Sequence, residues 1–97
     1  MAAIGPDPFL VKLRDVLGVL RVMVEVIDHP TVQRALAAVQ DASDVAQQDR
    51  REKELGRKLT LARRALREAL EAVPEQATYL KGCLGRMPTM RGGRSQS

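Results

Sequence analysis

The sequence predicts an all-α fold, a small three-helix bundle with a short fourth helix. Apolar residues recur every three or four positions over long segments, proline-containing segments separate them, and no strand pattern is evident. With 97 residues, the chain is long enough for one small domain. We therefore expect helices at about 8–28, 31–48, 50–73 and 75–84, all within a single domain at 1–85.

The first predicted helix is apolar around most of its circumference. Asp7 is a suitable N-cap, and Pro8 fits the first helical position, where its missing N–H costs nothing. A lone surface helix has a narrower apolar stripe, so we expect this helix to be central, with neighbours on more than one side. It carries a heptad-like seam, Phe9, Leu13, Val16, Leu20, Met23 and Ile27, between two apolar flanks, Leu10, Leu17 and Val24 on one side and Val19, Val22 and Val26 on the other.

The second predicted helix follows the pair His29-Pro30. A residue before proline is disfavoured in the helical conformation, so the first helix should end here, and Thr31 is the expected N-cap of the second. Half of the inward positions of this second helix are alanines, which have high helix propensity but bury little apolar area each. The inward positions are Val32, Leu36 and Val39 and the small residues Ala35, Ala42 and Ala46. We expect this helix to be a weak hydrophobic partner that lets its neighbours approach closely.

The polar segment 47–54 decides the architecture. Apolar stripes at helical spacing lie on both sides of it, one ending at Ala46 and the other beginning at Leu55. The nine-residue separation corresponds to about two and a half turns at ~100° per residue, so the two stripes point in opposite directions. One straight helix therefore cannot lay both stripes against the same partner.

Two arrangements satisfy this geometry. The chain breaks near Gln48, with Asp49 as N-cap and Glu52 at the third position of the next helix, a variant of the capping box. Alternatively, one long helix over 31–73 forms a helical hairpin that packs in an oligomer and contacts different partners on its two sides. We favour the break, because a compact monomer requires it.

The last helices are bounded by proline and glycine. The predicted helix 50–73 repeats the apolar spacing of the first and ends before Pro74. A short helix follows at 75–84, with Gly85 as its expected C-terminal stop. Residues 86–97 lack periodicity and are rich in Gly, Ser and Arg, so we predict a disordered basic tail.

The inventory of reactive side chains predicts that the protein is not an enzyme. His29 is the only histidine and Cys83 the only cysteine, so one chain cannot form a zinc site of the usual His/Cys type. We expect a capping or solvated role for His29, and Cys83 should act as a small apolar filler. No glycine-rich phosphate loop follows a strand, and aromatic residues are scarce. We therefore expect no cofactor, no metal and no small-molecule substrate.

Charge distribution, the N-terminal pattern and the cysteine count bear on the compartment and on membrane insertion. Five charged residues interrupt the most apolar segment, 9–27, which makes a membrane span improbable. The N-terminus lacks the basic and apolar regions of a signal peptide. A single cysteine fits a reducing environment, so we expect a cytoplasmic or other reducing intracellular location.

The first functional hypothesis is a protein–protein interaction or assembly module, such as an adaptor, a chaperone-like protein or a structural subunit. We expect the other helices to leave part of the Val19, Val22 and Val26 edge uncovered, and contiguous exposed apolar surface marks a binding face. The expected partner is a second copy or another helical protein, bound by coiled-coil or helix-in-groove packing. The alternative is that helix 75–84 covers these valines and the protein is a plain monomer.

The second hypothesis, which we rank below the first, is a small nucleic-acid-binding protein. Residues 1–48 hold four basic and six acidic side chains, whereas residues 49–97 hold twelve and six. Basic stripes attract phosphate backbones, but no aromatic side chain is interleaved here for base stacking. The candidate contacts are Arg50, Lys53, Arg57, Arg64, Arg91 and Arg94.

Overall fold

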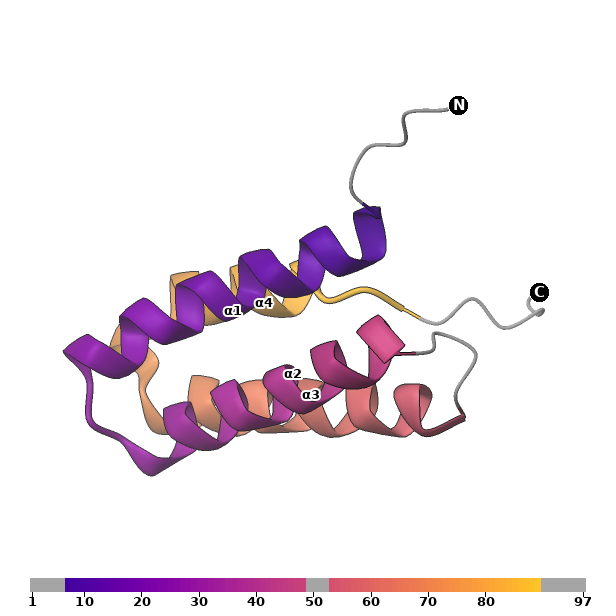
Figure 1. Ribbon diagram of the computed structural model, residues 1–97. Coiled ribbons are helices and arrows are strands. Elements are labelled where there is room, and N and C mark those ends of the chain that lie inside the picture. Colours follow the sequence, from indigo (N-terminus) through magenta and orange to yellow (C-terminus); the bar gives the residue numbers. More distant parts are fainter. Residues whose placement is uncertain (1–6, 49–52, 90–97) are drawn as a thin grey trace.

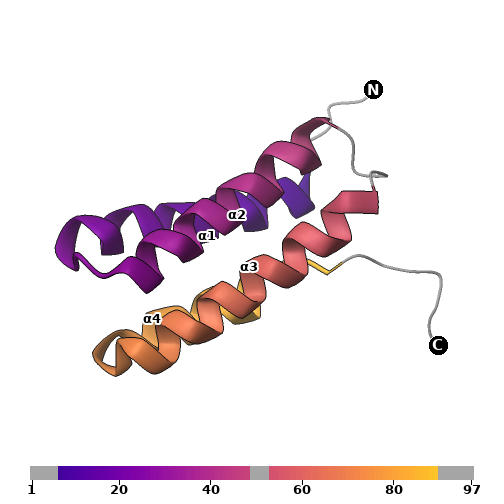
Figure 2. The same ribbon diagram turned by 90° about the horizontal axis from the view of Figure 1, so that it is seen from below.

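The computed structural model describes residues 7–48 and 53–89, and this part of the chain is all-α, as predicted. Successive helices run antiparallel, with α1 and α4 in one layer and α2 and α3 in the other (Figures 1 and 2). The elements are α1 (Pro8–Val26), α2 (Pro30–Gln48), α3 (Lys53–Ala72), a single 3-10 turn η1 (Pro74–Gln76) and α4 (Ala77–Arg86). The predicted bundle of three long helices with a short fourth helix is confirmed.

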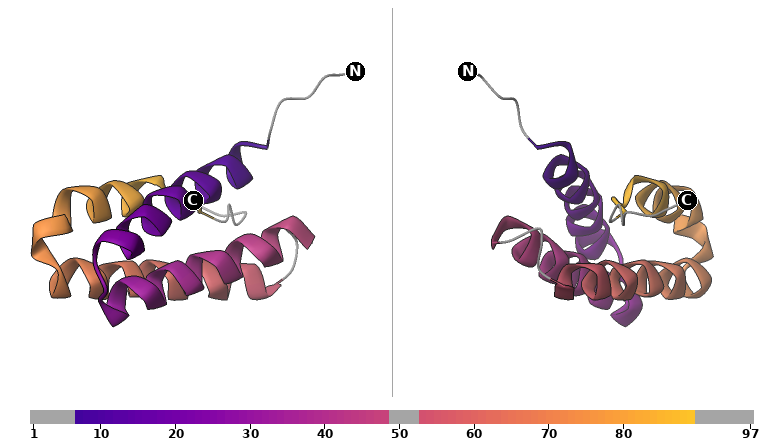
Figure 3. Two further views of the ribbon diagram at one scale, coloured as in Figure 1. Left: turned by 60° about the vertical axis from the view of Figure 1, so that its left-hand side comes forward. Right: turned by 90° about the vertical axis from the view of Figure 1, so that its right-hand side faces the viewer.

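The four helices form a ring around one core. Each helix contacts the next one in the chain, α4 returns to contact α1, and α2 and α3 share the most extensive interface. Across the bundle, α1 and α3 are diagonal to each other (Figure 3). Helix α1 therefore has neighbours on two sides, as predicted, but it is not central, because every helix of the ring has two neighbours. Because α4 has only 10 residues against the 19 of α1, it lies beside only part of that helix.

Helix α1 begins as predicted and ends two residues earlier. The carboxylate of Asp7 accepts a hydrogen bond from the backbone N–H of Phe9 at 2.9 Å, and Pro8 occupies the first helical position. At the other end, Ile27 is extended, and its N–H still bonds to the carbonyl of Met23. The extended backbone of Ile27 therefore ends the helix before the proline that was expected to end it.

Helix α2 begins at Pro30, and His29 caps it in place of the predicted Thr31. The Nδ1 atom of His29 accepts a hydrogen bond from the backbone N–H of Thr31 at 3.2 Å and lies 2.9 Å from its hydroxyl oxygen. The carbonyl of His29 also accepts the first helical bonds, from Val32 and Gln33. Thr31 was the more common type of cap, but Pro30 needs no hydrogen bond at the first position, which moves the cap to His29.

Removing this cap should weaken the fold modestly. We expect His29→Ala to lower the free energy of unfolding by about 1 kcal/mol, because the N–H of Thr31 loses its acceptor. His29→Asn offers another side-chain acceptor and should stay close to the wild type. Urea denaturation followed by circular dichroism measures the difference. Equal losses in both variants would show that the imidazole does not act as a cap.

The chain reverses direction between α2 and α3, which excludes the continuous helix over 31–73. The two apolar stripes around the polar segment pack against each other in the same core. The proposed caps Asp49 and Glu52, and the predicted start of the third helix at residue 50, lie outside the described residues. The buried positions are Val32, Ala35, Val39, Ala42, Ser43 and Ala46 on α2 and Leu55, Leu59, Ala62, Leu66 and Ala69 on α3.

The packed part of the chain extends beyond the predicted domain boundary. Helix α4 passes through Gly85 without a left-handed stop, since no glycine in the described ranges has a positive φ, and it ends at Arg86. Met87 is only 5% exposed and Pro88 is also buried. The start of the predicted tail therefore belongs to the folded domain, while residues 90–97 lie outside the part that the structure describes.

Candidate functional site

The three valines predicted as partner contacts lie on the outward side of α1. Val19, Val22 and Val26 are 39%, 63% and 74% exposed. On the opposite flank of the same helix, Leu17 is buried in the core. Helix α2 covers one flank of α1, and α4 leaves most of the other open to solvent.

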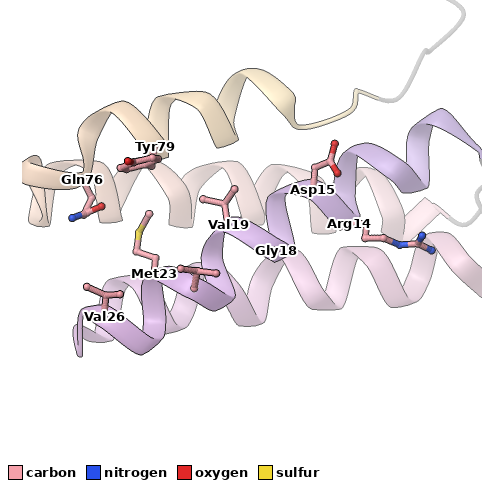
Figure 4. Close-up of a pocket in the computed structure, with 9 residues that line it drawn as sticks. Arg14, Asp15, Gly18, Val19, Met23, Val26, Gln76 and Tyr79 are labelled. Atoms are coloured by element: carbon pink, nitrogen blue, oxygen red, sulfur yellow. The ribbon is translucent and has the colours of Figure 1, made fainter.

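A hollow of about 630 Å³ lies along this open flank, between α1 and α4 (Figure 4). Met23 extends from α1 toward the side that carries Gln76 and Tyr79, and Val19 points toward α4. We call this hollow the α1–α4 groove. It is lined by Arg14, Asp15, Gly18, Val19, Val22, Met23, Val26, Gln76 and Tyr79.

Tyr79 is the groove residue that the sequence reasoning missed. In the predicted fourth helix the apolar residues at helical spacing are Ala77, Leu80 and Leu84, and Tyr79 lies off the face that they form. Its side chain is 62% exposed and stands across the groove from the valines of α1 (Figure 4). An aromatic residue off the apolar face of its helix is a usable signal, because exposed tyrosines are enriched at interfaces.

Helix α4 covers only the inner edge of the valine cluster. Exposure rises from Val19, which faces α4, to Val26 at the end of α1. A second, smaller hollow of about 320 Å³ continues along the same seam beside Gly82 and Arg86. Helix α4 therefore covers Val19 in part and leaves Val22 and Val26 mostly exposed.

An ion pair holds one end of the α1–α4 seam. The guanidinium of Arg86 donates to one carboxylate oxygen of Asp15 through both Nε and Nη2, with Nε at 3.1 Å. Both side chains are largely exposed, so the pair contributes only about 0–1 kcal/mol. Its effect on the site is mainly electrostatic, because it offsets the negative charge of Asp15 at the rim of the groove.

The basic residues predicted to bind nucleic acid are placed only in part. Lys53, Arg57 and Arg64 are exposed on α3. The other candidates, Arg50, Arg91 and Arg94, lie outside the described residues. The structure therefore places three of the six candidate basic residues, all on α3.

Neighbouring cations of α3 are engaged within the protein. The Nζ of Lys58 lies 3.1 Å from the carboxylate of Asp41 on α2. The guanidinium of Arg63 donates to the carbonyl of Pro88. Burial, and to a lesser extent the nearby charge of Arg67, lowers the pKa of Arg63. These contacts join α3 to α2 and to the segment that follows α4. They also reduce the number of α3 cations that are available to bind an external ligand.

Cys83 is an apolar filler, as predicted. It is 3% exposed, and burial raises the pKa of its thiol to about 11. The thiolate is the reactive form. At pH 8 we expect Cys83 in the folded protein to react with a disulfide reagent about a hundredfold more slowly than in urea, with a rate that rises about tenfold per pH unit below 11. Rapid labelling of the folded protein at pH 8 would show that the thiol is accessible.

No metal site is evident among residues 7–48 and 53–89, where no group of three His, Cys, Asp or Glu side chains is placed to hold an ion. Within the same ranges, no helix is both long and apolar enough to cross a membrane. Comparison of the chain with protein-family models, curated proteins and solved structures found no match. The surface itself is therefore the basis for a functional proposal.

Proposed function

We propose that this protein is a helical protein–protein interaction module that binds its partner through the α1–α4 groove. One observation carries the proposal. In the described ranges, five large apolar side chains are exposed, and four of them, Val19, Val22, Val26 and Tyr79, line this single hollow; the fifth is Leu61 on α3. Scattered apolar residues are normal on a protein surface, but clustering around a hollow is typical of a binding face.

The dimensions of the groove suit a helix. Its lining on α1 runs from Arg14 to Val26, which corresponds to about 18 Å or three turns at 1.5 Å per residue. A helix with apolar residues at positions i, i+3 or i+4, and i+7 would place them against the valines. Burying one valine side chain fully stabilises a complex by about 1.5–3 kcal/mol, so two or three of them provide a useful driving force.

Crosslinking in the native cell tests the proposal. A photoreactive amino acid at position 22 should capture a protein, either a second copy or a different chain, because Val22 lies at the centre of the exposed apolar cluster. The control is the same amino acid at Thr60, an exposed position on α3. Equal capture at the two positions, or none at position 22, would contradict binding through the groove.

Nucleic-acid binding is the competing hypothesis, and a salt titration of duplex binding tests it. It predicts an affinity for mixed-sequence duplex that falls steeply with salt, because bound cations would release counterions from the phosphates. Combined Arg57→Glu and Arg64→Glu substitution should then abolish binding, while Val22→Glu should leave it intact. That pattern, without protein capture at position 22, would replace the present proposal.

A further inference from the structure

We infer that the partner is a second copy of this chain and that the two α1 helices pack antiparallel, with Gly18 of each opposite Val22 of the other. This inference rests on the proposed function, because it assigns an occupant to the same apolar surface. Two independent features of α1 support it: a complementary pair of shapes and a complementary pair of charges.

The shapes are a notch at Gly18 and a projection at Val22. A glycine within a helix costs about 1 kcal/mol relative to alanine. Here the fold does not require it, since an added Cβ would meet no atom within 4 Å and no described glycine has a positive φ. Val22 is 63% exposed one turn further along the same face. The missing side chain of Gly18 therefore leaves a notch on the outer surface of α1. Val22 of a second copy has a suitable size to fill this notch.

An antiparallel pair matches these shapes and a parallel pair does not. A two-fold axis through the level of residue 20 places Gly18 of the first copy opposite Val22 of the second. By symmetry, Val22 of the first copy then lies opposite Gly18 of the second. In a parallel pair, each glycine would face a glycine and each valine a valine. The notch would then stay empty.

The same two-fold axis brings opposite charges together. Arg14 and Glu25 are eleven residues apart, which puts them within about 20° of each other around the helix at ~100° per residue. Both are exposed, and neither forms an ion pair with another described residue. Because they lie on opposite sides of residue 20, Arg14 of each copy meets Glu25 of the other. A parallel pair would instead set Arg14 at the level of Arg14 and Glu25 at the level of Glu25, so no opposite charges would meet.

Three other groove residues lie at the edge of this contact. Val26 and Tyr79 border the contact on the side of α4 and would be partly covered by it. Asp15 also faces the groove, but Arg86 already offsets its charge. A contact of about three helical turns is smaller than the standard ~800 Å² per partner, so we expect association in about the micromolar range.

Sedimentation equilibrium of the full chain over a hundredfold range of concentration tests the inference. The wild type should shift from one chain to two. Val22→Glu should weaken association at least tenfold, and Arg14→Glu or Glu25→Arg alone should weaken it severalfold. The combined Arg14→Glu and Glu25→Arg variant should recover wild-type affinity, because the exchanged charges meet again across the two-fold axis. Arg57→Glu on α3 is the control and should change nothing.

Gly18→Leu separates a role in association from a role in folding. The substitution should raise the thermal stability of the single chain at low concentration, because leucine favours the helix and the site is open. It should also weaken association at least tenfold, because the notch is filled. Equal affinity of this variant and the wild type would overturn the register, as would failure of the charge exchange to recover affinity. A wild type that remains a single chain throughout would overturn the second copy as partner; capture of a different protein at position 22 would then still support the interaction module.

Discussion

Leu59→Ala is expected to lower the free energy of unfolding by about 2–5 kcal/mol. Leu59 is completely buried on α3, where it packs in the shared core. Truncation removes apolar contacts and leaves a cavity that the neighbouring helices fill only in part. Because small domains are stable by only about 5–15 kcal/mol, this single change should remove a large share of the total. Thermal and urea denaturation, followed by circular dichroism, measure the loss.

Leu61→Ala is the matched control for this experiment. The same side chain stands two positions further along α3 but is 43% exposed. Its truncation should cost less than about 1 kcal/mol, because much of its apolar surface already faces water. Similar losses at the two positions would mean that the inward face of α3 is assigned wrongly.

Ala42→Leu should destabilise the protein by about 1–3 kcal/mol for the opposite reason, since it adds volume to a filled interior. Ala42 is 0% exposed on α2, the helix that shares the most extensive interface with α3. A larger side chain there must push the helices apart or adopt a strained rotamer. Denaturation experiments report the loss of stability, and faster amide hydrogen exchange along α2 and α3 would report looser packing between these helices.

Ala37→Leu provides the comparison on the same helix. Position 37 is exposed, so the added methyl groups enter solvent, and leucine is nearly as good a helix former as alanine. We expect a change within about 0.5 kcal/mol. If Ala42→Leu is equally harmless, α2 and α3 are not packed as closely as the structure has them.

Periodicity predicted the helices well because their cores follow simple spacing. The stripe from Leu55 to Ala69 is buried at every predicted position on α3. The opposed stripes left two arrangements open near residue 48, a reversal of the chain or one long helix with different partners, and the favoured reversal is confirmed. The spacing of apolar residues thus predicted the helices and reduced the architecture to two candidates.

The details that periodicity missed depend on contacts that spacing does not encode. Met87 and Pro88 follow the last helix without any repeating pattern, yet they are buried. The pairing of Lys58 with Asp41 joins residues on different helices, and no local rule identifies such partners. Prediction by preferred residue type likewise favoured Thr31 over His29 as the cap of α2.

The candidate site was predicted in part, for a related reason. The excess apolar surface of α1 was visible in the sequence, and it pointed to the valines. How much of this surface α4 would cover was not visible, because it depends on how a ten-residue helix sits against a longer one. Tyr79 entered the site only once that placement was known.

The return of α4 to α1 also bears on how the protein reaches its native state. Every other helix pair in contact within the described ranges is adjacent in the chain, so those contacts close only short loops. Joining α1 to α4 spans most of the polypeptide, as the 71-residue separation of Asp15 and Arg86 shows. Since loop-closure entropy grows with length, we expect α1–α2–α3 docking to precede this step. The seam that carries the groove is then the last to assemble and the first to open.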